Sequence, residues 1–440
     1  MYESPLEKYR RRVGAGMLGG FVALVGWWWT PGLPVWRAPS APIEVRAAGL
    51  ELFRHEWRPK DPLASGDGLG PVFNARSCVE CHSQGGVGGG GDNSHNVMAF
   101  EAHPTVDRPE VKGGLIHKFA VADPFIEGTK ALHQFFPVVK GGLRIESGCQ
   151  VLTQDFDPVS TQSVNSTALF GAGWLDRISA KTIQQHGLIA STAKIRKELG
   201  GDFSGVLPGR VRILSDGRVG KFGWKAQFAT LDEFVAAACA NEIGLGNPRM
   251  EQARPMVKVN YPKVEADLTS QQFRELVAFV DTLPRPVETL PADAPGQELA
   301  LRGKAVFREV GCAACHTPDV GGVEGVYTDF RLHRLDDPKL GGYRETPPVP
   351  LPEAYPLPEE WKTPALWGVA DSAPYLHDGS APTLEHAVSR HRGDAEPVYE
   401  AFGRLTHRDR GALFAFLSTL KAPTDAVPAA PPMSRLVMAR

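Results

Sequence analysis

Two five-residue segments of the chain combine cysteine and histidine at the same spacing. The first is Cys78-Val79-Glu80-Cys81-His82, and the second is Cys312-Ala313-Ala314-Cys315-His316. C-x-x-C-H is the attachment sequence of c-type haem, in which two thiols bond to the vinyl groups of the porphyrin and the histidine lies under the iron. With 6 cysteines and 13 histidines in 440 residues, the expected chance count is roughly 0.002. The two copies predict two covalently attached haems c, with His82 and His316 as iron ligands.

Other uses of these cysteines fit less well. A structural zinc site needs four ligands brought together, and a redox C-x-x-C does not need an adjacent histidine. Cys149 and Cys239 lie outside both motifs. They form either a disulfide or two buried thiols, and the thiols are the favoured interpretation.

The sixth position of each iron separates electron transfer from catalysis, because an open position lets a substrate bind. In the second half, Leu376-His377-Asp378-Gly379 precedes a predicted helix over residues 383–391. His386 and His391 are five residues apart in this helix, so they do not share a face. One of them can face the haem, and a surface position suits His386.

The chain is predicted to be folded and rich in loops. It has 440 residues, of which 42% are hydrophobic, with 47 glycines and 37 prolines. Lysine and arginine number 48 against 50 acidic residues, for a formal net charge of −2. This balance argues against a nucleic-acid partner, which requires a clustered basic surface.

The N-terminus carries an export signal or a membrane anchor. Lys8 and the arginines at positions 10–12 precede residues 13–29, which carry no charge and end in three tryptophans. This pattern is typical of a signal peptide or a short transmembrane helix. A tryptophan cluster suits a membrane interface, and small-x-small cleavage sites are poor here. We therefore favour an uncleaved anchor within residues 1–37 over cleavage. Both place the chain on the periplasmic side of the inner membrane.

The remainder of the chain has duplicated features. An amphipathic helix is predicted before each haem motif, over residues 43–57 and 297–309, and each half ends in an apolar-periodic helix, over residues 270–283 and 407–420. Matching features in the same order indicate two related units. Prolines between residues 284 and 296 mark a linker.

We therefore predict a mostly α, loop-rich fold of two tandem cytochrome c-like domains. The first spans residues 43–284, the second spans residues 297–423, a Pro-rich linker covers 285–296, and the tail covers 424–440. Alternation at residues 211–214 before Asp216-Gly217 predicts a small β hairpin inserted in the first domain.

Over roughly residues 45–422 the sequence resembles the bacterial di-haem oxidoreductases, relatives of the di-haem cytochrome c peroxidases and of MauG-type enzymes. The segments that carry the resemblance surround the haem motifs: Gly68-Leu69-Gly70-Pro71-Val72-Phe73-Asn74, the glycine-rich run 85–91, Phe222-Gly223-Trp224-Lys225-Ala226, Trp361-Lys362-Thr363-Pro364-Ala365-Leu366-Trp367-Gly368, Leu376-His377-Asp378-Gly379 and His391-Arg392-Gly393-Asp394-Ala395.

The resemblance implies roles for three further residues. The family's sixth ligand of the second haem lies 14 residues after the histidine of the His377 segment, which gives His391 and a bis-histidine haem. Trp224 aligns with His377 and corresponds to a tryptophan that carries electrons between the haems. Ala238 stands where His391 does in the other half, and Glu242 resembles the family glutamate over the open haem face.

Other positions carry alternatives. Phe234 replaces a glutamine that is frequent in the family, which makes the pocket more apolar. His95, on the loop after the glycine-rich run, is either a gating ligand of the first haem or an exposed loop residue, and Met98 is a weaker candidate. His333 resembles a recurrent family position, with a haem propionate as one partner. The family also implies a structural calcium between the domains.

The resemblance implies a peroxidase-like enzyme. Hydrogen peroxide, or an organic or protein substrate, would react at the first haem, and a small redox protein or a membrane donor would supply electrons through the second. The alternatives are a di-haem electron carrier without turnover, which follows if His95 binds iron permanently, and a protein that only stores haem.

Overall fold

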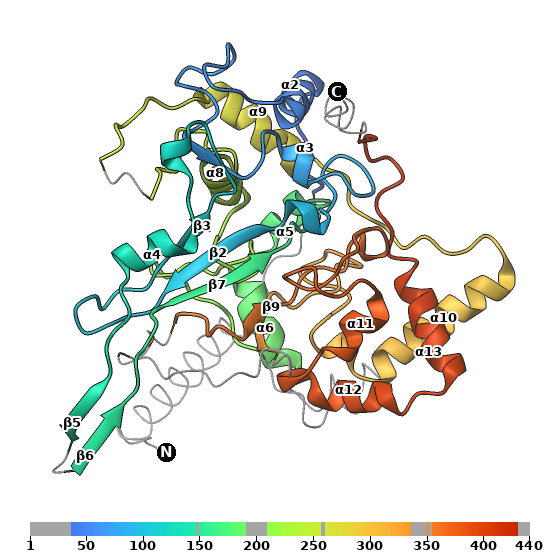
Figure 1. Ribbon diagram of the computed structural model, residues 1–440. Helices are drawn as coiled ribbons and strands as arrows, with labels where there is room; N and C mark the ends of the chain where they lie inside the picture. Colours follow the sequence, from blue (N-terminus) through green and yellow to red (C-terminus); the bar gives the residue numbers. More distant parts are fainter. Residues whose placement is uncertain are drawn as a thin grey trace, which may run out of the picture.

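The computed structural model describes residues 37–429, apart from 147–148, 191–208, 257–259, 336–348, 350 and 352–353 (Figure 1). The α-helices are α2 (Ile43–Arg54), α3 (Cys78–Cys81), α4 (Thr129–Phe135), α5 (Ala172–Arg177), α6 (Ala180–Ala190), α8 (Leu231–Glu242), α9 (Ser270–Asp281), α10 (Ala294–Glu309), α11 (Leu384–Ser389), α12 (Glu396–Gly403) and α13 (His407–Leu417). Short 3₁₀ turns lie at Asn93–His95, Asp123–Phe125, Cys312–Ala314, Val369–Asp371 and Gly393–Ala395.

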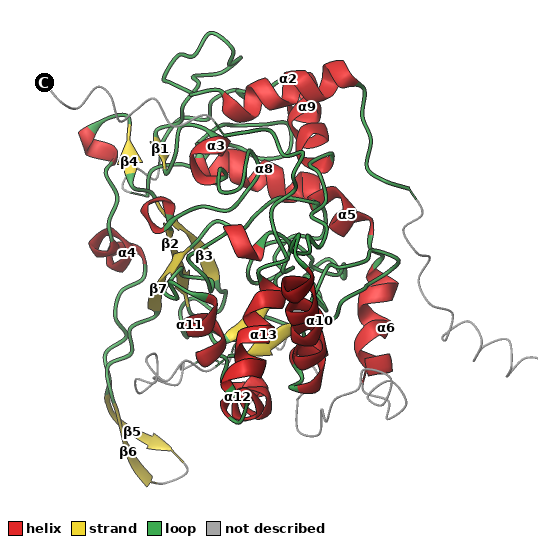
Figure 2. Cartoon of the chain, turned by 90° about the vertical axis from the view of Figure 1, so that its right-hand side faces the viewer, coloured by secondary structure: helices red, strands yellow, loops and turns green. Residues whose placement is uncertain are grey.

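The strands are short and antiparallel: β1 (Val72–Phe73), β2 (Val97–Ala102), β3 (Lys112–Ile116), β4 (Phe119–Ala120), β5 (Gly142–Glu146), β6 (Cys149–Thr153), β7 (Val159–Val164), β8 (Leu332–Arg334) and β9 (Glu360–Lys362). They form a three-stranded sheet in the order β3-β2-β7 and three two-stranded pairs, β1-β4, β5-β6 and β8-β9. In both views the β5-β6 pair extends away from the body (Figures 1 and 2). The architecture is therefore mixed helix and strand, and the prediction of a mostly α fold is not confirmed.

The four long helices expected from the sequence are present at nearly the expected positions. Local signals set where they begin. Thr269 and Gln272 form a capping box at the start of α9, and Thr406 caps α13 by accepting a hydrogen bond from the amide of Asp409. Asp293 caps α10, with a proline in the first turn. These caps satisfy amides that have no partner inside the helix.

The helices pack as two pairs, α2 against α9 and α10 against α13. A glycine makes each close approach possible. A Cβ on Gly49 would overlap the carbonyl oxygen of Glu275, and a Cβ on Gly303 would overlap that of Ala412. The two contacts occupy matching places in the two halves, which supports the predicted duplication.

Three hydrophobic clusters form the core. The first joins residues of the N-terminal half, such as Phe53, Val235 and Phe279, and the second joins C-terminal residues such as Phe307 and Phe416. The third draws on both halves: residues 178–219 contribute three buried side chains and residues 320–367 contribute five. The halves are thus packed on a shared apolar cluster.

Several sequence expectations can be compared directly with these elements. The predicted hairpin near Gly217 is only a short turn, closed by a bridge between Ile213 and Val219. It extends no further than Gly220, because the next residues, Lys221 and Phe222, pair with Phe228 instead. The larger β insertion lies at residues 97–164 instead. Cys149 is exposed on β6 and Cys239 is buried in α8, and neither is in a disulfide. The buried-thiol expectation is therefore right for Cys239 and wrong for Cys149.

The predicted membrane segment at residues 13–29 and most of the tail fall outside the described residues. Among the helices that are described, none combines the length and the apolar character needed to cross a membrane.

The helix contacts give a first prediction. Gly303→Ala, and in the same way Gly49→Ala, should destabilise the protein by about 1–3 kcal/mol, because the added methyl group forces apart two helices that touch through backbone. Chemical unfolding followed by far-UV circular dichroism measures the change. Gly411→Ala in α13 is the matched control, since a Cβ there meets no atom within 4 Å. It should stabilise by about 0.5–1 kcal/mol. Equal stability of the G303A and G411A variants would contradict the proposed contact.

Candidate functional site

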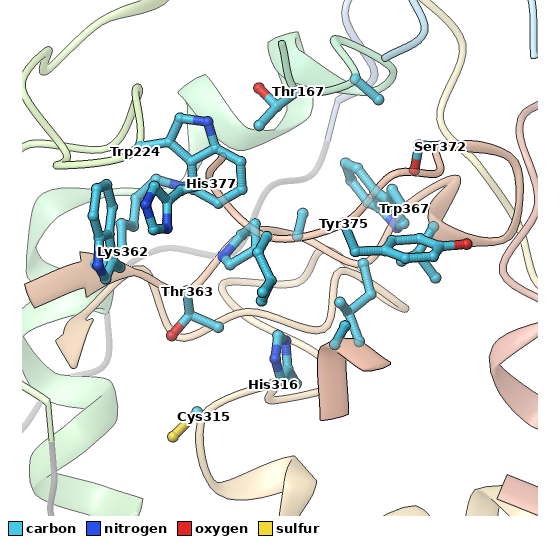
Figure 3. A pocket seen from close by; sticks show the side chains of 18 of the residues that line it. Thr167, Trp224, Cys315, His316, Lys362, Thr363, Trp367, Ser372, Tyr375 and His377 are labelled. Atoms are coloured by element: carbon cyan, nitrogen blue, oxygen red, sulfur yellow. The ribbon is translucent and has the colours of Figure 1, made fainter. Parts of the chain in front are cut away.

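A cavity of about 320 Å³ lies between the two halves of the chain. The N-terminal half contributes residues 165–175 and 221–224 to its wall, and the C-terminal half contributes the second C-x-x-C-H segment, residues 361–369 and residues 372–377. His316, Trp224 and His377 all border the cavity (Figure 3). The wall of the cavity is mostly apolar, which suits the flat face of a porphyrin. The histidines in the wall supply nitrogen atoms that can bind its iron.

His316 and His391 face one another across this cavity. Their ring centroids lie 6.4 Å apart. Two imidazoles bound to one metal through bonds of about 2.0–2.1 Å would have centroids separated by roughly 6.3 Å, if about 1.1 Å is added from nitrogen to ring centre. The spacing therefore fits an iron held between the two rings.

The hydrogen bonds of these rings leave the correct nitrogen available. Nδ1 of His316 bonds to the carbonyl oxygen of Tyr327 at 3.1 Å, and Nδ1 of His391 bonds to that of Ala387 at 2.7 Å. A carbonyl partner at one nitrogen fixes the tautomer and leaves Nε2 as the ligand atom. Burial lowers the pKa of both imidazoles, to about 4 for His316. Both rings are thus neutral at pH 7, as iron ligation requires.

Trp367 gives a second indication that the cavity fits a haem. Its indole Nε1 is buried, borders the cavity and finds no hydrogen-bond partner among the described residues. A buried donor without a partner is costly, and a haem propionate is an acceptor of suitable charge. The residues present thus fit a haem at the second C-x-x-C-H.

The first C-x-x-C-H repeats the proximal arrangement. Nδ1 of His82 bonds to the carbonyl oxygen of Gly89 at 3.0 Å, and burial lowers the pKa of this imidazole. The ring of Phe53 lies 6.4 Å from His82, and Phe307 lies 6.5 Å from His316. Each phenylalanine is four residues after the glycine of its helix contact. The paired helices therefore support both proximal histidines in the same way.

Glu242 lies at the end of α8, near Cys81, where its charge contributes to raising the pKa of that thiol. Burial raises the pKa of the Glu242 carboxyl, whereas the hydrogen bond from Asn74 and the charges of His117 and Lys118 oppose the rise. Nδ2 of Asn74 donates to the carboxylate at 2.9 Å, and the amide of Asn74 donates to the backbone oxygen of Glu242 at 2.7 Å. Asn74 lies in a segment that carries the family resemblance, but nothing in that segment indicates its contact with Glu242.

His95 is held on its own loop. Its Nδ1 lies 3.2 Å from the carboxylate of Asp92 and 3.1 Å from the hydroxyl of Ser94, and the side chain is partly exposed. It is also close enough to His82 to lower the pKa of that ring. Met98 is exposed on β2.

Trp224 stands at the boundary between the halves. Its Nε1 donates to the carbonyl oxygen of Asn165 at 2.9 Å, and its ring meets that of His377 edge to face at 6.4 Å. The structure thus brings together the two residues that the internal alignment had placed at equivalent positions. Figure 3 shows both rings at one side of the cavity.

Two positions singled out from the sequence, Phe234 and His333, make contacts that the sequence does not indicate. Phe234 stacks on Phe222 with centroids 5.7 Å apart, so it closes an aromatic wall. Both ring nitrogens of His333 have partners, Asp329 at 2.8 Å and the sulfur of Cys315 at 3.6 Å. The stacking of Trp361 on His377 at 3.6 Å was not expected from the sequence. Both residues belong to segments that carry the family resemblance, but nothing in those segments indicates a contact between them.

The raised pKa of Glu242 gives a prediction for pH dependence. A carboxyl whose pKa is raised in the folded state contributes stability below its unfolded value of about 4.3, and this contribution is lost as the pH rises through the folded pKa. Glu242→Gln should therefore reduce the fall of Tm between pH 4 and pH 8 by a few degrees, since about 1 kcal/mol shifts Tm by roughly 2–4 °C in large domains. Glu385→Gln, at an exposed position in α11, should leave the wild-type profile unchanged. If Tm fell as much in the E242Q variant as in the wild type between pH 4 and pH 8, the raised pKa of Glu242 would be contradicted.

Comparison with known proteins agrees with the haem motifs. Residues 215–420 match the family model described as "Di-haem oxidoreductase, putative peroxidase". The methylamine utilization protein MauG of Methylorubrum extorquens is 31% identical over 137 residues, which cover 29% of this chain and 36% of MauG. The chain thus spans little more than a third of the curated relative that it matches.

Solved structures align over most of the chain at low similarity. The di-haem peroxidase BthA of Burkholderia thailandensis is 15% identical with a TM-score of 0.41, covering 92% of this chain and 94% of its own. Hydrazine synthase of Kuenenia stuttgartiensis is 14% identical with a TM-score of 0.40, covering 89% and 96%.

The family match includes Trp224, Glu242 and the second C-x-x-C-H but not the first. Family members are oxidoreductases that hold two haems. The resemblance expected from the sequence is thus confirmed by the match of residues 215–420 to the di-haem oxidoreductase model.

Proposed function

We propose that this chain is an exported di-haem c-type oxidoreductase with peroxidase-like activity. His82 would hold the first haem, where hydrogen peroxide or an organic or protein substrate would react. His316 and His391 would hold the second haem, which would supply the electrons. The carrying observation is the asymmetry between two similar sites. Two neutral imidazoles face one another at the second site, whereas at the first Ala238 replaces the second histidine and a half-buried carboxyl, Glu242, stands nearby.

The proposal includes two cytochrome c-like domains, residues 43–284 for the catalytic haem and 297–423 for the electron-transfer haem. Cys78 and Cys81 would hold the first haem and Cys312 and Cys315 the second, each through two thioether bonds. Burial raises the pKa of the Cys78 and Cys312 thiols, so neither is a free thiolate. When bound, the haems supply the redox chemistry, which their axial ligands and surroundings tune.

Glu242 would move the proton that peroxide cleavage requires, from the oxygen near the iron to the departing oxygen. A group does this best when its pKa is close to the working pH. Burial moves the pKa of Glu242 in that direction. One hydrogen bond from Asn74 holds the carboxylate and a second holds the backbone oxygen of Glu242. Asn74 is in turn fixed because its Oδ1 accepts from the amide of Lys118 at 3.0 Å.

Trp224 would carry electrons between the halves. It lies in the wall of the cavity that contains His316 and donates a hydrogen bond to Asn165. Its backbone oxygen also accepts from the amide of Lys362 at 2.8 Å. Contacts to both halves hold the indole in one orientation, which a relay requires.

Export follows from covalent haem attachment, which takes place outside the cytoplasm. We place the protein on the periplasmic side of the inner membrane, held by an anchor within residues 1–37 or released by cleavage. A small redox protein or a membrane donor would supply its electrons. A structural calcium between the domains, as in the family analogy, is also part of this proposal, and elemental analysis of the purified protein tests it together with the two irons.

The deciding experiment is EPR and visible spectroscopy of the fully oxidised and half-reduced holoprotein, before and after hydrogen peroxide. We expect one high-spin and one low-spin haem, with the high-spin signal lost on peroxide addition. Two low-spin haems in every state, inert to peroxide, would replace this proposal with an electron carrier.

Ligation of the second haem is tested by His391→Ala. Removal of one imidazole should convert the low-spin EPR signal of that haem to high spin, since iron then keeps one strong axial ligand. His386→Ala is the control, because His386 lies exposed in α11 five residues before His391. If His386→Ala instead removes the low-spin signal, the assignment of the ligand is wrong.

The role of His95 is tested by His95→Ala. If His95 gates the first haem, the variant should react with peroxide in the fully oxidised state, without the half-reduction that the wild type then needs. If the loop residue is only exposed, stopped-flow traces of the two proteins should coincide. Asp92→Ala removes its 3.2 Å partner and should shift reactivity in the same direction as His95→Ala, if that contact positions the ring.

A further inference from the structure

One aromatic ring at the boundary of the halves is covered on both faces. The imidazole of His377 stacks on Trp361 with centroids 3.6 Å apart and planes at 12°. The ammonium nitrogen of Lys225 lies 3.7 Å from the centre of the same indole. Two groups at nearly equal heights above one ring centre cannot occupy the same face. Trp361 is therefore enclosed between an imidazole and a cation.

The ammonium of Lys225 is held firmly where it is. It donates to three backbone carbonyl oxygens, those of Leu357 at 3.0 Å, Pro358 at 2.7 Å and Glu360 at 2.7 Å. These bonds use all three donors of the group. Backbone carbonyls just before and at the start of strand β9 thus hold the ammonium group over the Trp361 ring.

Trp224 is in the opposite electrostatic situation. Its N–H points to a carbonyl oxygen, that of Asn165, at 2.9 Å. A negative dipole at the N–H stabilises positive charge on the indole, whereas an ammonium over the ring face opposes it. Both rings contact the same His377 imidazole. If Trp224 loses an electron, Trp361 is therefore a nearby indole to which the positive charge could move. Removal of an electron takes more energy at Trp361 than at Trp224.

We propose that Lys225 keeps Trp361 reduced and thereby confines an oxidising equivalent to Trp224. Lys225 is a positioning residue for charge, acting through Trp361 without contact to a substrate. The proposal rests on the proposed function, because it needs an oxidant at the first haem. It assigns a role to Lys225, which no contact with a haem ligand explains.

The electron balance is simple. Hydrogen peroxide takes up two electrons and two protons and gives two water molecules. When the external donor supplies fewer than two electrons in time, the protein supplies one from an indole, which becomes a cation radical until the donor returns the electron. Lys225 decides which indole this is. If the electron is not returned, further peroxide withdraws a second electron from the radical, and water adds to the indole with release of two protons. The product is a hydroxylated side chain, which peptide mass spectrometry detects.

The charge on Lys225 also responds to pH. Burial lowers its pKa to about 7. Three carboxylates, Glu101, Glu359 and Glu360, favour the cation, and Arg212 opposes it. Burial also lowers the pKa of His377, to about 4, so the imidazole across the ring is neutral. Protection of Trp361 should be strong at pH 6 and lost at pH 8.5.

The experiment compares wild-type holoprotein with Lys225→Met at pH 6. Each protein receives excess hydrogen peroxide without a donor, and the oxygenated fraction of Trp361 is measured by peptide mass spectrometry. We expect a rise of roughly tenfold in K225M, because a buried cation–π contact is removed. Lys304→Met is the control: Lys304 lies 5.9 Å from the ring of Phe416 and does not line the cavity, and its loss should leave Trp361 at the wild-type level.

A second oxidant separates this proposal from the proposed function. A photogenerated ruthenium oxidant withdraws electrons from tryptophan without peroxide, and it should oxidise Trp361 more in K225M than in wild type. If peroxide is not consumed by any variant, the proposed function fails, and the photo-oxidation still tests Lys225. Wild type compared at pH 6 and pH 8.5 needs no variant to fold. Equal oxidation of Trp361 in wild type, K225M and K304M, and at both pH values, would overturn the proposal.

Discussion

Close backbone contact between paired helices is the constraint on which both haem sites depend. Gly49 lets α2 approach α9, and Gly303 lets α10 approach α13. One turn further along α2 and α10, Phe53 and Phe307 then lie against the proximal histidines, and each also meets a phenylalanine of the partner helix, at 5.2 Å and 5.3 Å. The backbone contact between the helices thus sets the position of each proximal imidazole, and with it the position of the C-x-x-C-H segment.

The two sites share the same support for the proximal histidine but differ at a few residues on the helix that follows. His391 faces His316, whereas the corresponding helix of the first half carries Ala238 and ends at Glu242. An imidazole is suited to bind iron, whereas a carboxyl held by Asn74 is suited to exchange a proton. Under the proposed function, different roles for the two haems would therefore need a change of one side chain on one helix, and the phenylalanines beside the two proximal histidines would stay the same.

Sequence patterns predicted the local parts of this arrangement. The C-x-x-C-H segments and the four long helices depend on residue type, caps and periodicity within one stretch of chain, and the resemblance supplied His391 and Trp224. The sheet β3-β2-β7 was missed because β2 pairs with β7 some sixty residues later, and its alternation is short. The enclosure of Trp361 was missed for a different reason. Lys225 and His377 are more than 150 residues apart, and only tertiary packing places them on the two faces of one ring.

Asn165 shows how the halves are held at a fixed separation. This buried residue donates its backbone amide to the carbonyl of His377 at 2.7 Å and accepts from the indole of Trp224. Its side chain donates to the oxygen of Gly91, at the end of the glycine-rich run after the first haem motif, at 3.0 Å. One asparagine therefore connects the loop near the first haem, the proposed relay and the second half. Since the rate of electron transfer falls steeply with distance, a relay across two packed units needs such a rigid connection. The apolar cluster shared by the two halves, which includes Phe330 and Trp367, also holds them together.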